Sequence, residues 1–242
     1  MKYRTSLARE ALARLTEEAV PDTENDYNDD SGISEEEIEE KISLNEERLG
    51  TVLAVLKESG AKSVIDLGCG EGHLLSLLIK DKQFENIVGM DVSIRSLERA
   101  SKKLNLEKLP PVKRKRIDLL HSSLMYRDKR FNGYDAAAII EVIEHFDPPR
   151  LAAFERVVFE FAKPKTVIVT TPNKEYNIMW ENLENDKLRH SDHRFEWTRR
   201  EFEQWCNTIS QKYNYQVNFI SIGKEQDNIG TPTQMGVFTI TK

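Results

Sequence analysis

Two glutamates and a histidine stand close together near the middle of the chain, where an apolar run ends in Glu-Val-Ile-Glu-His, from Glu141 to His145. If a helical turn begins at Glu141, then Glu141, Glu144 and His145 occupy positions i, i+3 and i+4 and share one face of that turn. Two carboxylates this close repel each other unless a cation or a proton lies between them. The pattern therefore predicts a site for a divalent ion, Mg²⁺ or Mn²⁺, with the imidazole favouring Mn²⁺.

A second group of possible ligands follows further along the chain, in residues 188–197. His190, Asp192 and His193 fall within four residues of one another, and each can supply a fourth ligand. An exposed helix start without a metal is the alternative interpretation of the Glu-x-x-Glu-His spacing, and this second group weighs against it. Zinc is less expected, because neither Cys69 nor Cys206 lies near these residues in the sequence.

A glycine-rich loop lies upstream of both groups. The chain reads Asp-Leu-Gly-Cys-Gly-Glu-Gly from Asp66, which places glycines at Gly68, Gly70 and Gly72. Glycine allows the backbone to turn sharply and to approach a ligand that a Cβ atom would keep away. The spacing differs from the Gly-x-Gly-x-x-Gly of dinucleotide-binding folds, and the preceding Asp66 suits a cationic ligand better than a pyrophosphate.

Polar residues at the ends of the next two predicted strands complete the expected cofactor site. Asp91 is the last residue of the second strand, 21 residues after Gly70, where a carboxylate can accept both hydroxyls of a ribose. Ser122 and Leu124 lie at the close of the third strand, at a usual position for adenine contacts. Together with the glycine loop, these residues resemble the S-adenosylmethionine site of class I methyltransferases, so S-adenosylmethionine is the predicted cofactor. A purely structural glycine turn is the alternative.

Short β-branched runs alternate with helical patterns from Lys62 onward, which is typical of strand-helix-strand units on a parallel sheet. We expect an α/β fold of the class I S-adenosylmethionine-dependent methyltransferase type. This Rossmann-like fold has an open, doubly wound, mostly parallel seven-stranded sheet with an antiparallel edge strand, and its ligands lie at the carboxyl ends of the strands. Strands are predicted at 63–67, 86–91, 117–122, 135–140, 166–171, 216–222 and 234–241. Helices are predicted at 43–59, 72–80, 93–104, 151–161 and 198–212.

The composition bounds the remaining possibilities. A chain of 242 residues, 39% hydrophobic and 31% charged, suits one domain with decorations. We expect a leader helix and an acidic linker in residues 1–43, followed by the methyltransferase domain in residues 44–242. No apolar run approaches the length of a membrane span, which predicts no membrane association. With two cysteines, a disulfide framework is excluded and a reducing cytoplasm is the expected location.

Three motifs together resemble one family, the small-RNA 3′-terminal 2′-O-methyltransferases (the Hua-enhancer family). They are the Glu-Val-Ile-Glu-His run, the run Thr171-Pro172-Asn173, and the run Asp-His-Arg-Phe-Glu-Trp-Thr-Arg that begins at Asp192. The resemblance extends from about Leu44 to Trp205. In that family the two glutamates, the adjacent histidine and the histidine of the last run hold a divalent ion. The ligand set that the resemblance implies is Glu141, Glu144, His145 and His193.

The resemblance also implies an activity and partners. The expected reaction is metal-dependent methyl transfer from S-adenosylmethionine to the 2′-hydroxyl of the 3′-terminal nucleotide of RNA, with Glu144 and His145 as catalytic residues. The chain resembles the methyltransferase portion of a bacterial RNA-repair member, which implies a polynucleotide kinase-phosphatase partner. Two alternatives are a metal-dependent methyltransferase of a small vicinal-diol or catechol-like acceptor and a non-catalytic binding module. RNA contacts are expected from Thr171, Asn173, Arg189, Arg194 and Arg199.

Overall fold

The computed structural model describes residues 35–180 and 187–241. The chain divides into two compact units, Met1–Glu39 and Glu40–Lys242. In the first unit, only the beginning of helix α2 (Glu35–Glu58) is described. The predicted leader helix and most of the acidic linker lie outside the described residues, so the boundary at residue 43 stays a prediction.

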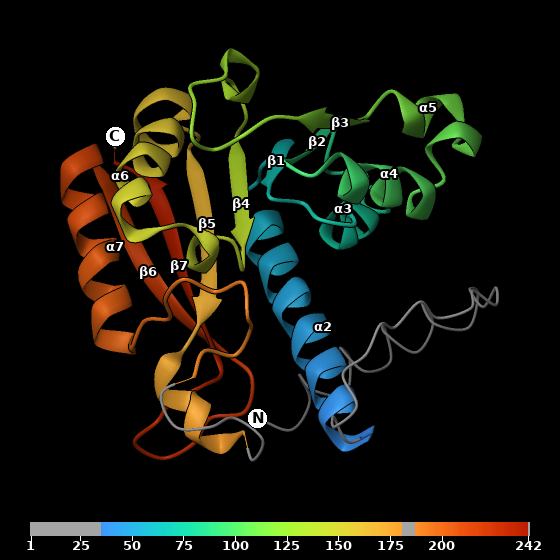
Figure 1. Cartoon of the computed structure of the whole chain (residues 1–242). Coiled ribbons are helices and arrows are strands. Elements are labelled where there is room, and N and C mark those ends of the chain that lie inside the picture. Colours follow the sequence, from blue (N-terminus) through green and yellow to red (C-terminus); the bar gives the residue numbers. More distant parts are fainter. Residues whose placement is uncertain (1–34, 181–186, 242) are drawn as a thin grey trace. The chain divides into compact units, whose positions relative to one another are not determined.

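Within the described residues, seven strands form one sheet in the order β3-β2-β1-β4-β5-β7-β6 (Figure 1). Strands β1 to β5 run parallel, while β7 pairs antiparallel with both β5 and β6. The predicted α/β fold class is therefore confirmed, with the antiparallel strand one position inside the edge. The strands are β1 (Ser63–Leu67), β2 (Asn86–Asp91), β3 (Ile117–His121), β4 (Ala136–Ile140), β5 (Thr166–Pro172), β6 (Tyr215–Ile222) and β7 (Thr233–Ile240).

Helices connect the strands and lie close to the predicted positions. The longer ones are α2, α4 (Ile94–Lys103) and α7 (Arg199–Tyr213), and α7 begins with a capping box between Thr198 and Glu201. The shorter helices are α3 (His73–Leu78), α5 (Pro111–Arg114) and α6 (Leu151–Glu155), and a π-helical segment, η5 (Arg156–Ala162), continues α6. The remaining turns are η1 (Leu106–Lys108), η2 (Lys129–Phe131), η3 (Ile143–His145), η4 (Pro148–Arg150) and η6 (Lys174–Met179).

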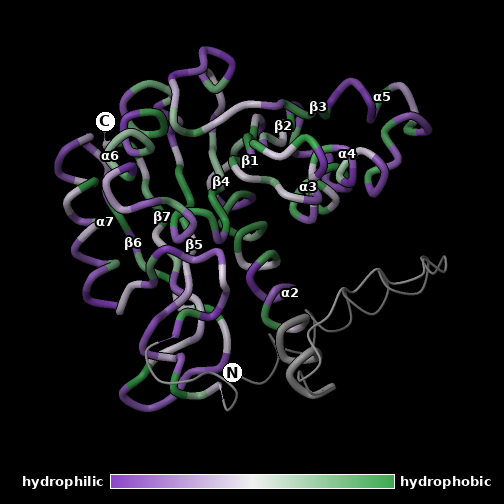
Figure 2. The backbone as a smooth tube through the Cα atoms, viewed as in Figure 1, coloured by the Kyte–Doolittle hydropathy of each residue, from purple (hydrophilic) through white to green (hydrophobic). Residues whose placement is uncertain are grey.

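The two faces of the sheet carry separate hydrophobic cores. Alternate residues of each strand point to opposite faces, so Ile65 and Leu67 of β1 pack with α6, η5 and α7, whereas Val64 packs with α2, α3 and α4. Figure 2 shows the central strands as mostly hydrophobic and the connecting loops as mostly hydrophilic. Helices on both faces hold the carboxyl ends of β1, β2, β4 and β5 at one edge, where the predicted functional residues follow.

One boundary differs clearly from the expectation. Helix α2 begins at Glu35, whereas the apolar periodicity predicts a start at residue 43. The added residues are mostly glutamate, which has a high intrinsic helix propensity and favours the first turns of a helix. Among the described residues, no helix is both long enough and apolar enough to cross a membrane.

Candidate metal and cofactor site

The glycine loop after β1 folds over the end of β2. Backbone N–H groups of Gly68 and Cys69 donate to the Met90 carbonyl at 2.8 and 2.9 Å, and Gly70 N–H donates to Asp91 Oδ2 at 2.9 Å. Gly68 has φ of 92°, and a Cβ atom there would lie 2.6 Å from Val142 Cγ2. Glycine is therefore required at residue 68 both by the backbone conformation and by the close approach of the β4 loop.

A cavity of about 540 Å³ lies beside this loop at the carboxyl edge of the sheet. Gly68, Asp91, Ser122 and Leu124, four residues predicted to bind the cofactor, line it together with His145. A second cavity of about 200 Å³ adjoins the loop on the α2 side and contains the predicted residues Asp66 and Gly70 in its lining. Glu141 and Gly68 line both cavities.

Gly72 lines neither of these two cavities. It has a left-handed backbone conformation at the N-terminus of α3, and a Cβ atom there would lie 3.2 Å from the Ala100 Cβ of α4. Its structural role is to bring α3 close to α4, so the predicted direct contact with a cofactor has no support from this geometry.

Asp66 is a buried carboxyl group at the end of β1, with only 3% of its surface exposed. Burial and then the nearby charge of Asp91 raise the pKa of Asp66 to about 7. A positively charged ligand in the adjoining cavity would favour the ionised form. This electrostatic environment fits the cationic cofactor predicted from the sequence.

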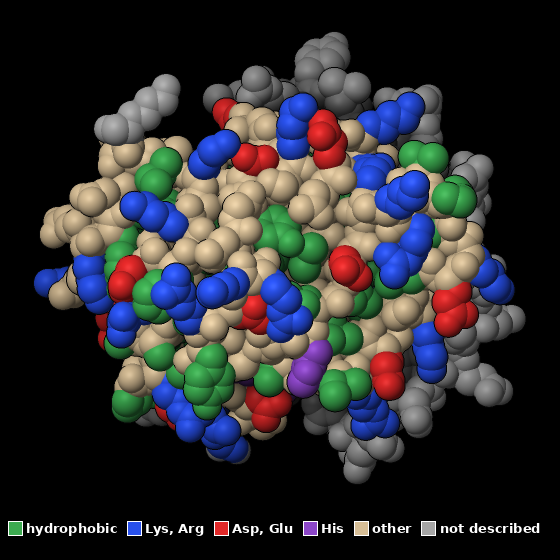
Figure 3. Space-filling model, turned by 90° about the horizontal axis from the view of Figure 1, so that it is seen from above, with side chains coloured by type: hydrophobic (Ala, Val, Ile, Leu, Met, Phe, Trp, Pro, Cys, Tyr) green, Lys and Arg blue, Asp and Glu red, His purple; other side chains and the backbone are tan. Residues whose placement is uncertain are grey.

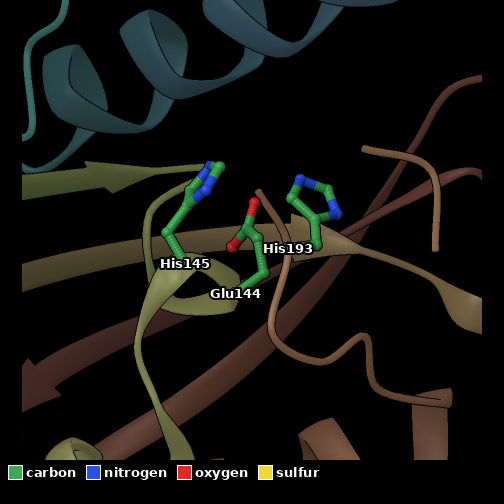
Figure 4. A group of neighbouring side chains, drawn as sticks. All are labelled: Glu144, His145 and His193. Carbon is green, nitrogen blue, oxygen red and sulfur yellow. The ribbon is translucent and has the colours of Figure 1, made fainter. Parts of the chain in front are cut away.

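Glu144, His145 and His193 form a compact group of possible metal ligands (Figure 4). One ligand atom from each residue lies within 4.8 Å of the others. Glu144 and His145 come from η3, and His193 comes from the segment that follows residue 187. The Arg194 N–H donates to the Glu144 carbonyl at 2.7 Å, which fixes the second segment against the first.

Glu144 is fully buried and only partly satisfied by hydrogen bonds. Its Oε2 accepts from Thr171 Oγ1 at 3.1 Å, while Oε1 has no hydrogen-bond partner among the described residues. Burial, followed by the charge of Glu141, raises the pKa of Glu144 well above its usual value. A buried carboxylate oxygen without a donor fits a cation, which would offset the cost of ionising the group.

The side chain of His193 is oriented by a buried carboxylate. Its Nδ1 lies 2.6 Å from Glu196 Oε1, which assigns the proton to Nδ1 and leaves Nε2 as the free ligand atom. Glu196 also accepts from Asn177 Nδ2 at 2.5 Å and from the Arg189 N–H at 2.7 Å. Burial opposes ionisation, but these bonds, that of His193 foremost, lower the pKa of Glu196 overall. Such a carboxylate behind a histidine is common in metal sites.

His145 lies on the exposed side of the group. Its ring is edge-on to that of His193, with centroids 4.9 Å apart, and its Nδ1 lies 3.3 Å from the Asp192 carbonyl. Burial and then the charge of His193 lower the pKa of His145, which keeps a neutral imidazole available near pH 7. His190 is outside the group, with its ring 6.3 Å from that of His145 and its Nδ1 accepting from the Asp192 N–H.

Glu141 does not belong to the helical turn that the spacing predicts. It has φ of 53°, and the 3-10 turn begins only at Ile143. Its Oε1 accepts from Thr170 Oγ1 at 2.9 Å, and its Oε2 lies 3.4 Å from Arg48 Nη2. The left-handed residue redirects the chain after β4, so Glu141 does not share a helical face with Glu144 and His145 as expected, and its role as a metal ligand stays a prediction.

Known proteins resemble the chain at the level of both sequence and structure. A family model described as a methyltransferase domain matches residues 6–217. The solved methyltransferase domain of a bacterial Hen1 protein is 62% identical with a TM-score of 0.75, and the match covers 81% of this chain and 100% of that domain. The chain belongs to the Hen1 methyltransferase family. It has the fold of class I S-adenosylmethionine-dependent methyltransferases.

More distant proteins also match much of the chain. A small RNA 2′-O-methyltransferase of Mus musculus is 36% identical over 206 residues, which are 82% of this chain and 51% of the mouse protein. The chain thus spans about half the length of this relative. A chain from the solved Pnkp1/Rnl/Hen1 RNA repair complex shares the fold, with 22% identity and a TM-score of 0.62. The match covers 81% of this chain and 41% of that chain.

Within this Hen1 domain, three residues predicted to contact RNA instead hold the site together. Thr171 is buried and donates to Glu144, and the buried Asn173 donates to the carbonyls of Ile229 and Thr231. Arg189 is only partly exposed, and its guanidinium donates to Asn177 Oδ1 and to the carbonyls of residues 173 and 232. These side chains therefore support the segment that carries His193, and their contact with RNA stays a prediction.

The other two predicted RNA contacts differ from each other. Arg199, at the first turn of α7, pairs with Glu175 at 2.8 Å and donates to the Asn228 carbonyl. Arg194 lines the larger cavity with its side chain 57% exposed and a weak pairing of 3.9 Å with Asp147. Of the two, Arg194 is the one with an exposed side chain at the cavity that also contains His145, and contact of either arginine with RNA stays a prediction.

Sequence reasoning missed two residues of the Hen1 site. Glu196 lies inside the quoted Asp-His-Arg-Phe-Glu-Trp run, three residues after His193, and this spacing was the available signal. Arg48 lies on α2, far along the chain from the loops that it contacts, and its surroundings gave no distinctive pattern.

Proposed function

We propose that this chain transfers a methyl group from S-adenosylmethionine to the 2′-hydroxyl of the 3′-terminal nucleotide of RNA in a metal-dependent reaction. The observation that carries the proposal is one cavity that joins the glycine loop and Asp91 to His145 of the ligand group. The 36% identity to a small RNA 2′-O-methyltransferase of Mus musculus supports RNA as the acceptor over a small diol.

The cofactor would be bound by the loop after β1 and the ends of β2 and β3. Asp91 has both carboxylate oxygens engaged by backbone N–H groups, from Gly70 and Ser93, and each oxygen retains a second lone pair for a ribose hydroxyl. Asp66 offers a carboxylate to the cationic end of the cofactor. Ser122 and Leu124 line the same cavity and are the proposed contacts of the adenine.

Glu144, His145 and His193 are the residues that would hold a divalent ion. The unpartnered Glu144 Oε1 and the free Nε2 of His193 fit a cation in this position. A bound ion would supply Lewis acidity toward the two neighbouring hydroxyls of a terminal ribose. The fourth residue that the motif resemblance implies, Glu141, would have to leave its contacts with Thr170 and Arg48 to join them.

The protein groups around the ion set protonation and orientation. His145 donates from Nδ1 to the Asp192 carbonyl, so its lone pair is on Nε2. A ligand nitrogen shares this lone pair with the ion and becomes a weaker base, so we assign His145 first to the ion and only second to the hydroxyl proton. Thr171 and Glu196 hold Glu144 and His193 in place and would reduce the reorganisation needed in the reaction.

RNA would be recognised mainly by its end. Arg194 and Arg150 line the cavity near the ligand group and are exposed, which suits contact with terminal phosphates. On the face seen in Figure 3, Lys and Arg side chains are spread among Asp and Glu rather than gathered in one continuous track. We therefore assign no long phosphate path to that face.

We further propose that the chain acts in RNA repair with a polynucleotide kinase-phosphatase partner in a reducing cytoplasm. The motif resemblance to bacterial RNA-repair members supports the partner. Two free buried cysteines, Cys69 and Cys206, are consistent with the compartment. Size-exclusion chromatography of the chain mixed with such a kinase-phosphatase tests the association, and separate elution would contradict it.

Transfer of labelled methyl groups to matched RNAs tests the activity. Three otherwise identical short RNAs end in a 2′,3′-diol, a 2′-deoxy nucleotide or a 3′-phosphate, and Mn²⁺ is present. We expect label in the diol RNA alone, because only that end offers the acceptor with a free neighbouring hydroxyl. Label in the 2′-deoxy RNA would show that the methyl acceptor is not the terminal 2′-hydroxyl. Label in a small catechol but in none of the RNAs would favour the small-acceptor enzyme.

A further inference from the structure

The side-chain amide of Asn177 lies between two charged side chains behind the ligand group. Its Nδ2 donates to Glu196 Oε2 at 2.5 Å, and its Oδ1 accepts from Arg189 Nε at 2.6 Å. Asn177 belongs to η6 and does not line the larger cavity that contains His145. It can therefore act on the site through Glu196, the carboxylate that orients His193.

The direction of the Asn177 amide is fixed by its two neighbours. A guanidinium only donates hydrogen bonds, and an ionised carboxylate only accepts them. The amide oxygen must therefore face Arg189 and the amide nitrogen must face Glu196. Aspartate has nearly the same shape but would present an oxygen to Glu196 in place of the donor.

The Glu196 carboxylate depends on this donor, because its side chain is fully buried. Its Oε1 lies 2.6 Å from His193 Nδ1 and accepts from the Arg189 N–H at 2.7 Å. Its Oε2 has Asn177 as its one donor among the described residues. Removing that donor would leave a buried oxygen unsatisfied, which costs free energy and frees the carboxylate to rotate away from His193.

The segment from the end of β5 into η6 supports both halves of the ligand group. Thr171, in β5, donates to Glu144, and Asn177, further along the same segment, donates to Glu196. The backbone between them forms a parallel bridge with Trp197. One continuous piece of chain thus holds the two carboxylates at their positions.

We propose that Asn177 is a positioning residue for the metal-ligand group, which directs His193 Nε2 toward the ion by fixing the Glu196 carboxylate. The inference rests on the metal of the proposed function and not on its RNA acceptor. It requires the direction of the hydrogen bond from Asn177, and a side chain that only fills the same volume is not sufficient.

Reversing that direction tests the proposal. In Asn177→Asp, two carboxylates would face each other, and we expect Mn²⁺ to bind roughly 10- to 100-fold more weakly. Asn177→Leu, which fills a similar volume without a donor, should also weaken binding. Competition with a fluorescent Mn²⁺ indicator at pH 8, which favours ionisation of the new acid, measures the affinity. Binding of S-adenosylhomocysteine should stay like that of the wild type.

Exchanging the amide and the acid should restore the bond. When Asn177→Asp is combined with Glu196→Gln, the new amide can donate to the new carboxylate while its oxygen still accepts from His193. The total charge equals that of the wild type. We therefore expect the double variant to bind Mn²⁺ more tightly than Asn177→Asp alone. The matched control is Asn207→Asp, at an exposed residue of α7, which should bind Mn²⁺ like the wild type.

Three results would overturn the proposal. They are wild-type Mn²⁺ affinity in Asn177→Asp and Asn177→Leu, a double variant that binds Mn²⁺ no better than Asn177→Asp, and an equal loss of Mn²⁺ and S-adenosylhomocysteine affinity in all three variants. A wild-type protein that does not bind Mn²⁺ would overturn the metal assignment together with this inference. Normal Mn²⁺ binding combined with no methyl transfer to RNA would instead count against the proposed function alone.

Discussion

The glycine loop and the metal-ligand group lie at the same edge of the sheet but are built in different ways. The loop is held mainly through its backbone, by hydrogen bonds to Met90 and Asp91 at the end of the next strand, β2. The ligand group joins two distant segments through side chains and depends on Thr171 and Glu196 behind the ligands. We therefore expect the ligand group to be the more sensitive of the two to substitution of the side chains that support it.

Of the substitutions considered, Glu144→Gln, in the ligand group, should reduce methyl transfer the most. The amide removes the negative charge that the ion requires, so methyl transfer with Mn²⁺ should fall roughly a thousandfold while S-adenosylhomocysteine binding is retained. Steady-state transfer to a diol-ended RNA and titration of S-adenosylhomocysteine are the two measurements. Glu160→Gln, at an exposed acid paired with Arg156, is the control. Full activity of Glu144→Gln would remove the metal group from the mechanism.

Asp91→Ala tests the cofactor site beside the glycine loop. It removes the acceptor of the Gly70 and Ser93 N–H groups and the proposed partner of the ribose hydroxyls. We expect S-adenosylhomocysteine to bind about 10- to 100-fold more weakly, with Mn²⁺ affinity close to that of the wild type. Titration of each ligand separately checks this. A comparable loss of Mn²⁺ affinity would show that the two regions are not independent.

Glu196→Gln tests the residues behind the ligands, because it changes the carboxylate that orients His193 and leaves the three candidate ligands intact. A neutral amide holds the His193 Nδ1 proton less strongly, so Mn²⁺ affinity should fall about tenfold. Glu203→Gln, at an exposed residue of α7, is the control. Competition with a fluorescent Mn²⁺ indicator measures both variants, and unchanged affinity in Glu196→Gln would make the orientation of His193 unimportant.

The smallest effect that we expect is a change of stability with pH, which depends on Asp66 at the start of the glycine loop. The pKa of Asp66 is raised from 3.8 to about 7 in the folded protein, so its contribution to stability is fully present below its unfolded value and is lost as the pH rises through about 7. Between pH 6 and 8 the ligand-free protein should lose roughly 1 kcal/mol, a few degrees in Tm. Asp66→Asn should remove this contribution. Equal pH profiles of the two proteins would contradict the shift.

The sequence predicted the sheet well because its strands are short, apolar and bounded by polar or glycine residues. β1 and β2 begin and end at the predicted residues, and the final two strands form the expected antiparallel pair. The glycine loop was predicted from its glycine spacing, although the close approach of Val142 that excludes a Cβ at Gly68 is a tertiary contact that the spacing does not reveal. The start of α2 was missed because apolar periodicity is absent from its acidic first turns.

The ligand group was only partly predictable. Glu144 and His145 follow from their adjacency after β4, but the left-handed conformation of Glu141 depends on contacts with Thr170 and Arg48 that sequence spacing does not reveal. Arg189 was expected to meet a phosphate because it flanks the predicted metal-ligand segment in the sequence. Its guanidinium instead satisfies backbone carbonyls inside the fold, a tertiary arrangement that composition does not predict.

Anomalous X-ray diffraction from crystals of the protein grown with Mn²⁺ tests the proposed metal site, because it locates the ion without reference to activity. We expect an anomalous peak bounded by the Glu144 carboxylate and the imidazoles of His145 and His193. A peak at another carboxylate cluster, with none between these three side chains at saturating Mn²⁺, would contradict it.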